Sequence, residues 1–211
     1  MIRGVVSDFG GVLTSPLMDA FSRLQEGIDV PAEAYGEAMA HSLARDGAHP
    51  LFALERGEIS EAEFLARLER GLEAAIGRSV SLHGFGTLLM DELRPNHELF
   101  DHFRALKRDN GLRFALCTNN VREWEPLWRP KLPIDEVFDV VVDSAFVGTR
   151  KPEPEIYAIT LERLGLAATE CAFLDDLEVN VAAARHAGMH GIVYRENSRA
   201  IAELASVLGG N

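Results

Sequence analysis

Short apolar segments alternate along the chain with segments of helical periodicity, and this alternation constrains the fold more than any other feature. The apolar segments are five near-continuous runs rich in Val, Ile and Phe, at residues 2–7, 113–118, 137–144, 171–174 and 191–194. Such runs are typical of strands in a parallel sheet that helices cover on both faces. Strands that alternate with helices over short connections predict a doubly wound, Rossmann-like α/β core.

The interval 15–93 has a different texture. It contains no convincing strand pattern, and its best-defined helix opens with the capping-box sequence of residues 60–63, followed by an apolar stripe from Phe64 to Ile76. An earlier helix start is expected at 29–31. We therefore predict an α/β core formed by 1–14 and 94–211, with 15–93 inserted as an all-helical cap after the first strand. Since ligands bind beyond the carboxyl ends of such strands, the cap is expected to cover the site.

Composition and charge exclude several classes of function. Of the 211 residues, 47% are hydrophobic, which is ordinary for a globular protein. The net charge of −12 disfavours binding to nucleic acid or to an anionic membrane surface, since both would repel the chain. The two cysteines, Cys117 and Cys171, are too few for a disulfide framework, so we expect buried thiols. Without a secretory signal or an apolar run of about 20 residues, a cytoplasmic location is expected.

Polar residues follow four of the predicted strands at their carboxyl ends. They are Asp8, Thr118, the pair Arg150-Lys151 and the pair Asp175-Asp176. An acid, a hydroxyl, a cation and an acid pair at one edge of a sheet suit phosphoryl transfer, which needs a nucleophile, charge neutralisation and hydrogen-bond donors. Aspartate is a covalent nucleophile in such reactions. Carboxylates without His or Cys are hard oxygen ligands, which favours Mg²⁺ over zinc.

Four segments in this order resemble the motifs of the haloacid dehalogenase-like hydrolase superfamily: SDFGGVLT at 7–14, LCTNN at 116–120, TRKPEPEIY at 149–157 and FLDDLEVN at 173–180. The resemblance covers the whole chain. It is strongest to the small-cap phosphatase branch that includes the N-terminal phosphatase domain of soluble epoxide hydrolase. It implies an Mg²⁺-dependent phosphatase that acts on a small phosphorylated metabolite through an aspartyl-phosphate intermediate.

The resemblance also implies roles for single residues. Asp8 matches the nucleophile, which also ligates Mg²⁺, and Gly10 matches a position whose main-chain carbonyl is a metal ligand. Thr118 matches the hydroxyl that binds the phosphoryl group, with help from Asn119. Lys151 matches the cation that neutralises nucleophile and phosphate.

The last motif supplies the remaining metal ligand. Asp176 matches the metal carboxylate, and Asp175 and Asn180 are expected to support it. Which of Asp175 and Asp176 holds the metal depends on the alignment of this motif.

The sequence departs from the family pattern at Gly10. Phosphatases of this superfamily usually carry a second aspartate there as general acid and base, a function typically worth about 10² to 10⁴ in rate. Its loss leaves three interpretations open. The enzyme acts slowly, or it relies on a good leaving group or a water in the vacated space, or it is no longer a phosphatase.

Two alternatives to a phosphatase therefore remain. A 2-haloacid dehalogenase of the same fold would use Asp8 to displace halide and needs no Mg²⁺, although the acid pair at 175–176 argues for a metal. A non-catalytic phosphometabolite-binding protein with a degenerate site is the other. Within the predicted cap, Arg45 and Arg56 are candidate contacts for an anionic or hydroxylated substrate, unless they are simply solvated. The sequence indicates neither the substrate nor the oligomeric state.

Overall fold

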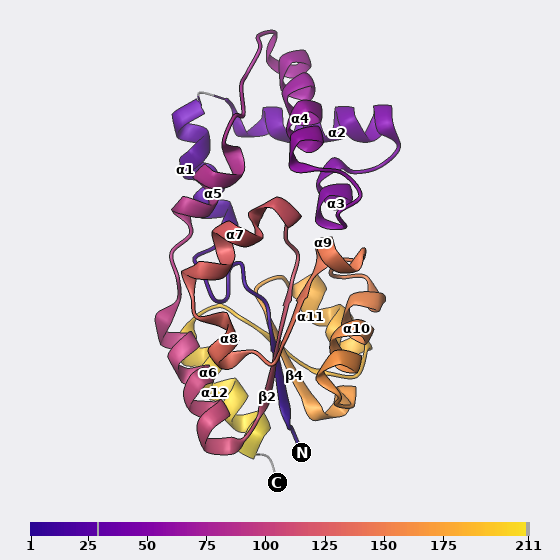
Figure 1. Ribbon diagram of the computed structural model, residues 1–211. Helices are drawn as coiled ribbons and strands as arrows, with labels where there is room; N and C mark the ends of the chain where they lie inside the picture. Colours follow the sequence, from indigo (N-terminus) through magenta and orange to yellow (C-terminus); the bar gives the residue numbers. More distant parts are fainter. Residues whose placement is uncertain (29, 210–211) are drawn as a thin grey trace.

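A five-stranded parallel sheet forms the centre of the molecule (Figure 1). The computed structural model describes residues 1–28 and 30–209. The strand order is β3-β2-β1-β4-β5, and β1 lies in the middle, with Val5 opposite both Phe114 and Ala172. The strand bounds are β1 Gly4–Ser7, β2 Arg113–Thr118, β3 Val140–Asp143, β4 Cys171–Asp175 and β5 His190–Val193.

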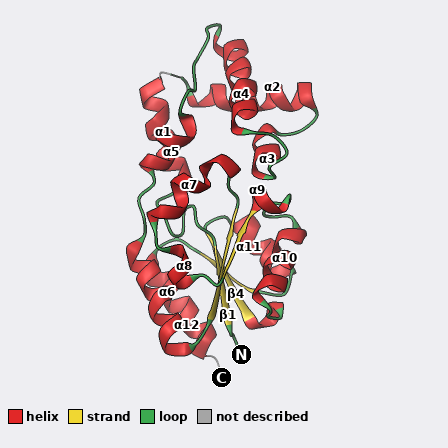
Figure 2. Cartoon of the chain, in the orientation of Figure 1, coloured by secondary structure: helices red, strands yellow, loops and turns green. Residues whose placement is uncertain are grey.

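Helices cover both faces of this sheet, as the near-continuous apolar strands predicted. Figure 2 shows α6 and α12 on one side and α10 and α11 on the other. The longer core helices are α6 His97–Asn110, α10 Pro154–Leu164, α11 Glu178–His186 and α12 Asn197–Gly209. The shorter ones are α7 Glu125–Trp128, α8 Ile134–Val137 and α9 Ser144–Val147. The expected doubly wound α/β fold is therefore confirmed.

One expected strand is shorter than its apolar run. The run 137–144 contains the end of α8 at Val137 and the start of α9 at Ser144, so only Val140–Asp143 is strand. The Asp143 side chain accepts a hydrogen bond from the Ala145 amide at 3.0 Å and caps α9. The prediction was wrong here because short helices pack as apolar segments too, and periodicity does not separate them from strand in so few residues.

Five helices lie together beyond the carboxyl ends of the strands, above the sheet in Figure 1. They are α1 Leu17–Ile28, α2 Ala32–Asp46, α3 Pro50–Glu55, α4 Glu61–Ile76 and α5 Phe85–Glu92. The chain leaves the core and returns at one place, where Thr14 and Pro95 form an isolated antiparallel bridge. The division into a core of 1–14 and 94–211 and a cap of 15–93 stays our prediction, and this crossing agrees with it.

The helix α4 shows how the local sequence directs this region. Ser60 accepts a hydrogen bond from the Glu63 amide at 3.2 Å, and the helix ends at Gly77 in the left-handed conformation. Its buried stripe packs on α2, where Gly71 lies so close to Ala38 that a Cβ would approach the Ala38 Cα to 2.7 Å. The expected helix start at 29–31 falls partly on residue 29, outside the described residues, and α2 begins just after it.

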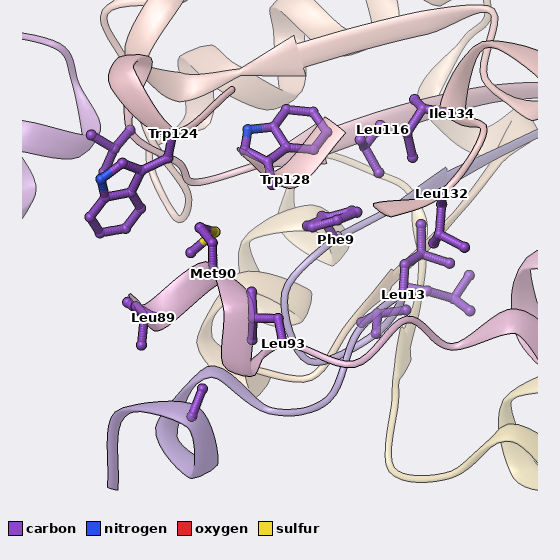
Figure 3. Packing of buried hydrophobic residues seen from close by; sticks show 14 of the residues in the cluster. Phe9, Leu13, Leu89, Met90, Leu93, Leu116, Trp124, Trp128, Leu132 and Ile134 are labelled. Carbon is purple, nitrogen blue, oxygen red and sulfur yellow. The ribbon is translucent and has the colours of Figure 1, made fainter. Parts of the chain in front are cut away.

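The hydrophobic core continues from the sheet into these five helices as one cluster. Figure 3 shows Leu89 and Met90 of α5, and Leu93 directly after it, in the same cluster as Trp124 and Phe9. The rings of Phe9 and Trp128 lie 4.9 Å apart, and Trp128 is fully buried. Apolar packing therefore holds α5 against the edge of the sheet where β1 ends.

Candidate active site

The site begins where three neighbouring strands end. Thr118 and Asp175 are the last residues of β2 and β4, and Asp8 directly follows β1. The Asp8 amide donates to the Leu174 carbonyl at 2.9 Å, which continues the sheet register by one residue. Because the three strands are adjacent and parallel, these side chains meet at one edge, as the sequence predicted.

Lys151 links two of these carboxylates. Its Nζ lies 2.7 Å from Asp8 Oδ1 and 2.7 Å from Asp175 Oδ2, and the side chain is 1% exposed. Asn119 holds the Lys151 main chain from both sides: Asn119 Nδ2 donates to the Lys151 carbonyl at 3.0 Å, and the Lys151 amide donates to Asn119 Oδ1 at 2.7 Å. The lysine is therefore positioned by its main chain as well as by its charge.

The two acids of the last motif differ in what surrounds them. Asp175 is fully buried and contacts Lys151. It also accepts hydrogen bonds from the Leu177 main-chain amide at 2.9 Å and from the Asn180 side-chain Nδ2 at 3.0 and 3.1 Å. Asp176 is only partly buried. Asp175 is thus committed to organising the site, while Asp176 keeps the more accessible carboxylate.

The carboxylates carry more negative charge than one lysine neutralises. Oxygens of Asp8, Asp175 and Asp176 lie within 4.8 Å of one another. Burial raises the pKa of Asp8 to about 7, with Lys151 opposing this and the two other carboxylates adding to it. Burial also raises the pKa of Asp176, and Asp175 acts in the same direction. A cluster of hard oxygen donors with excess negative charge fits a divalent cation such as Mg²⁺.

Burial alone would lower the pKa of Lys151, but the Asp175 and Asp8 carboxylates reverse this and hold it well above its usual range. The lysine therefore remains a cation in its buried position. Cys117 lies in the strand before this site, and burial raises the pKa of its thiol to about 11. Both cysteines are buried and free, so the expectation of buried thiols is confirmed.

Gly10 and Gly11 differ in the space that their backbone leaves for a side chain. Gly11 has φ +79°, and a Cβ on it would lie 2.3 Å from Asp176 Oδ2, so a side chain would displace the carboxylate. Apart from Gly10 itself and its two chain neighbours, no atom of the described residues lies within 4 Å of a Cβ built on Gly10. The missing carboxylate at position 10 therefore leaves open space, and a side chain there meets no steric obstacle at its first carbon.

An apolar cavity of about 380 Å³ opens from this edge toward α1–α5. Gly10, Thr118 and Asn119 line it on the side of the sheet. The opposite wall is mainly apolar and comes from the helices above, including Phe21, Met39, Leu51, Phe64, Leu68 and Leu89. A group bound at the strand ends therefore lies next to a cavity that suits an apolar substituent.

The structure does not bring Arg45 and Arg56 to this cavity. Arg45 is 55% exposed and lies 3.7 Å from Asp46, while Arg56 forms an ion pair with Glu153 of the core. Neither belongs to the described residues that line the cavity. Their proposed contact with substrate is left as an untested prediction.

Sequence reasoning missed Glu55, which lines the cavity and forms an ion pair with Arg150. The chain offers one weak signal for it, an isolated acid at the end of the apolar sequence PLFAL.

A family model described as haloacid dehalogenase-like hydrolase matches residues 2–188 of the chain. This range includes the aspartate after the first strand and the lysine that bridges it to the last motif. The chain belongs to this family. The resemblance drawn from the four motifs is thus confirmed, and the protein is a hydrolase of the haloacid dehalogenase-like type. Within the described residues, no helix combines the length and apolar character needed to span a bilayer.

Among curated relatives, mouse acyl-CoA dehydrogenase family member 10 is 32% identical over 98% of this chain and 19% of its own length. Mouse bifunctional epoxide hydrolase 2 is 26% identical over 99% of this chain and 39% of its own length. The hydrolase described here thus spans well under half of these two relatives. Phosphatase MT3486 of Mycobacterium tuberculosis is 31% identical over 71% of each chain.

A solved structure from Porphyromonas gingivalis, described as a predicted HAD-like family hydrolase, is similar over the full length of both chains. The TM-score is 0.74 and the sequences are 25% identical. The helices inserted after the first strand are therefore part of the likeness, because the match includes them.

Proposed function

We propose that this hydrolase is an Mg²⁺-dependent phosphatase that releases an apolar leaving group from a phosphate monoester. The observation behind the proposal is the buried Lys151, which bridges Asp8 and Asp175 at the edge of the sheet where Gly10, Thr118 and Asn119 line an apolar cavity. The position of a cation beside a carboxylate nucleophile is what phosphoryl transfer requires, because charge accumulates on the phosphoryl oxygens. The relative named as a phosphatase supports this class of reaction.

In this proposal each core residue acts on the phosphoryl group. Asp8 attacks phosphorus and forms the aspartyl-phosphate, Lys151 neutralises the phosphoryl oxygens, and the Thr118 hydroxyl donates a hydrogen bond to them. Asp8, Asp176 and the Gly10 carbonyl would hold Mg²⁺, with Asp175 supporting the site through Lys151 and Asn180. Bound Mg²⁺ supplies further neutralisation of the phosphoryl charge.

The cavity supports a proposal for the substrate class. Its wall offers apolar side chains from α2, α3 and α4, which favour an alkyl, prenyl or aryl group over a sugar or a second phosphate. Each buried methylene is worth about 0.8 kcal/mol, so kcat/KM should rise about fourfold per methylene until the cavity is full.

The test measures phosphate release with Mg²⁺ and with EDTA. The substrates are n-alkyl phosphates of increasing length, glucose 6-phosphate and p-nitrophenyl phosphate, with chloride release from chloroacetate measured in parallel. We expect Mg²⁺-dependent release that increases with alkyl length. Chloride release without Mg²⁺ would instead favour the dehalogenase, and phosphate release that favours glucose 6-phosphate would overturn the assignment of an apolar leaving group.

A matched pair of variants locates the alkyl preference. Met39→Gln places a polar amide in the cavity wall, whereas Leu65→Gln does so at a partly buried position of α4 that does not belong to the described lining. Met39→Gln should weaken the dependence on alkyl length, and Leu65→Gln should leave it intact. Equal effects would show that the cavity does not hold the leaving group.

A further inference from the structure

The proposed reaction lacks an obvious proton donor. An alkoxide leaving group needs a proton as the P–O bond breaks, and general acid catalysis typically supplies about 10² to 10⁴ in rate. Gly10 has no side chain, and the space beside it is open toward the cavity. A group on the far wall of that cavity can therefore reach the leaving oxygen if it projects toward the strand ends.

Glu55 is such a group. It ends α3, its side chain is 15% exposed, and it lines the same cavity as Gly10 and Thr118. Among the described residues that line the cavity, it is the single charged side chain. Apart from its ion pair with Arg150, the Glu55 carboxyl stands alone as a charge in an otherwise uncharged and mainly apolar lining, in the cavity that Gly10 and Thr118 also line.

Arg150 fixes the orientation of Glu55. Its guanidinium forms an ion pair with the Glu55 carboxylate and lies 4.1 Å from the centre of the Phe52 ring. Arg150 directly precedes Lys151, whose main chain Asn119 holds. Glu55 is thus connected through one residue, Arg150, to the lysine that contacts the nucleophile, so its position is defined relative to Asp8.

The electrostatic surroundings allow Glu55 to exchange a proton. Burial raises its pKa above the ordinary value, and the cations Arg150, Lys151 and Arg56 oppose that rise. A raised pKa lies closer to neutral pH, where a carboxyl is more effective as an acid and base.

We propose that Glu55 is the general acid and base of this enzyme and replaces the aspartate that Gly10 lacks; this inference rests on the proposed phosphatase function. In the first half-reaction Asp8 forms a bond to phosphorus, the bond from phosphorus to the leaving oxygen breaks, and that oxygen takes the proton of the Glu55 carboxyl. In the second, a water oxygen bonds to phosphorus, its proton passes to the Glu55 carboxylate, and the Asp8–phosphorus bond breaks. Glu55 ends protonated, as it began.

The test compares two substrates of almost the same shape. The p-nitrophenolate anion leaves without a proton, whereas phenolate gains from one. In Glu55→Gln, kcat/KM for phenyl phosphate should fall about 10²-fold or more, while that for p-nitrophenyl phosphate should fall by less than about tenfold. The alkaline decrease of kcat/KM for phenyl phosphate should also disappear in the variant. The ratio of the two substrates does not depend on how much of the variant is folded.

Glu153→Gln is the matched control. Glu153 pairs with Arg56 in the neighbouring contact between the helices and the core, but it does not belong to the described residues that line the cavity. If Glu55 merely docks α3, both variants should reduce the two substrates alike, and that result would overturn the proposal. An unchanged substrate ratio in Glu55→Gln would overturn it as well.

A second variant tests whether a carboxyl at position 10 restores proton donation to the leaving oxygen. Gly10→Asp in the Glu55→Gln background should bring the substrate ratio back toward the wild-type value, since the Cβ has room. The wild-type enzyme separates the two proposals: without Mg²⁺-dependent release of phosphate from either substrate the proposed function itself fails, whereas release with an unaltered ratio in Glu55→Gln refutes only the role of Glu55.

Discussion

Replacing Lys151 with Met removes the cation on which the site depends. The variant keeps most of the side chain's volume but leaves Asp8, Asp175 and Asp176 facing one another within 4.8 Å. Breaking a buried ion pair by removal of one partner typically costs about 3–5 kcal/mol. For a chain of this size about 2–4 °C of melting temperature corresponds to each kcal/mol, so the midpoint should fall by about 6–20 °C. Phosphate release should be lost as well.

Thermal unfolding followed by circular dichroism at neutral pH, with and without Mg²⁺, measures this effect. Mg²⁺ should stabilise Lys151→Met more than the wild type, because the cation then neutralises carboxylates that have lost their lysine. The control is Lys107→Met, which removes a 2.8 Å ion pair with Asp139 whose side chains are 29% and 32% exposed. Such a pair is worth about 1 kcal/mol or less. A loss in Lys151→Met no larger than in this control would refute the electrostatic reasoning.

Three further predictions follow from the same geometry. Asp8→Asn should reduce phosphate release by about 10³-fold or more while the melting temperature changes little, and appreciable turnover would exclude Asp8 as nucleophile. Asp176→Ala should raise the Mg²⁺ concentration for half-maximal activity by at least about tenfold, whereas the same effect in Asp175→Ala alone would exchange their roles. Burial raises the pKa of Asp143 to about 7. The folded protein therefore favours the protonated carboxyl, and its free energy of unfolding falls as pH rises from the ordinary aspartate pKa toward that value. Asp143→Asn should therefore be increasingly more stable than wild type between about pH 4 and 8, by at most about 4 kcal/mol, in urea titrations; a pH-independent difference would contradict this.

The candidate site could be predicted wherever a residue's place follows from the strand that precedes it. Asp8, Thr118 and Asp175 stand at strand ends, and parallel strands bring their ends to one edge. Lys151 was predictable through its motif, although its bridge between two carboxylates depends on a turn held by Asn119. The roles of these residues stay predictions that the variants above will test.

The sequence by itself determined the class of the fold, because periodicity and apolar runs report how each segment is buried, and it determined the order of the motifs. It could not place Arg56 or Glu55. These two residues are neighbours at the end of α3, but their side chains have different surroundings. Arg56 pairs with Glu153, whereas Glu55 lines the cavity and pairs with Arg150. That difference depends on how α3 packs against the core, a contact between residues about a hundred positions apart, and only tertiary structure decides contacts of that kind.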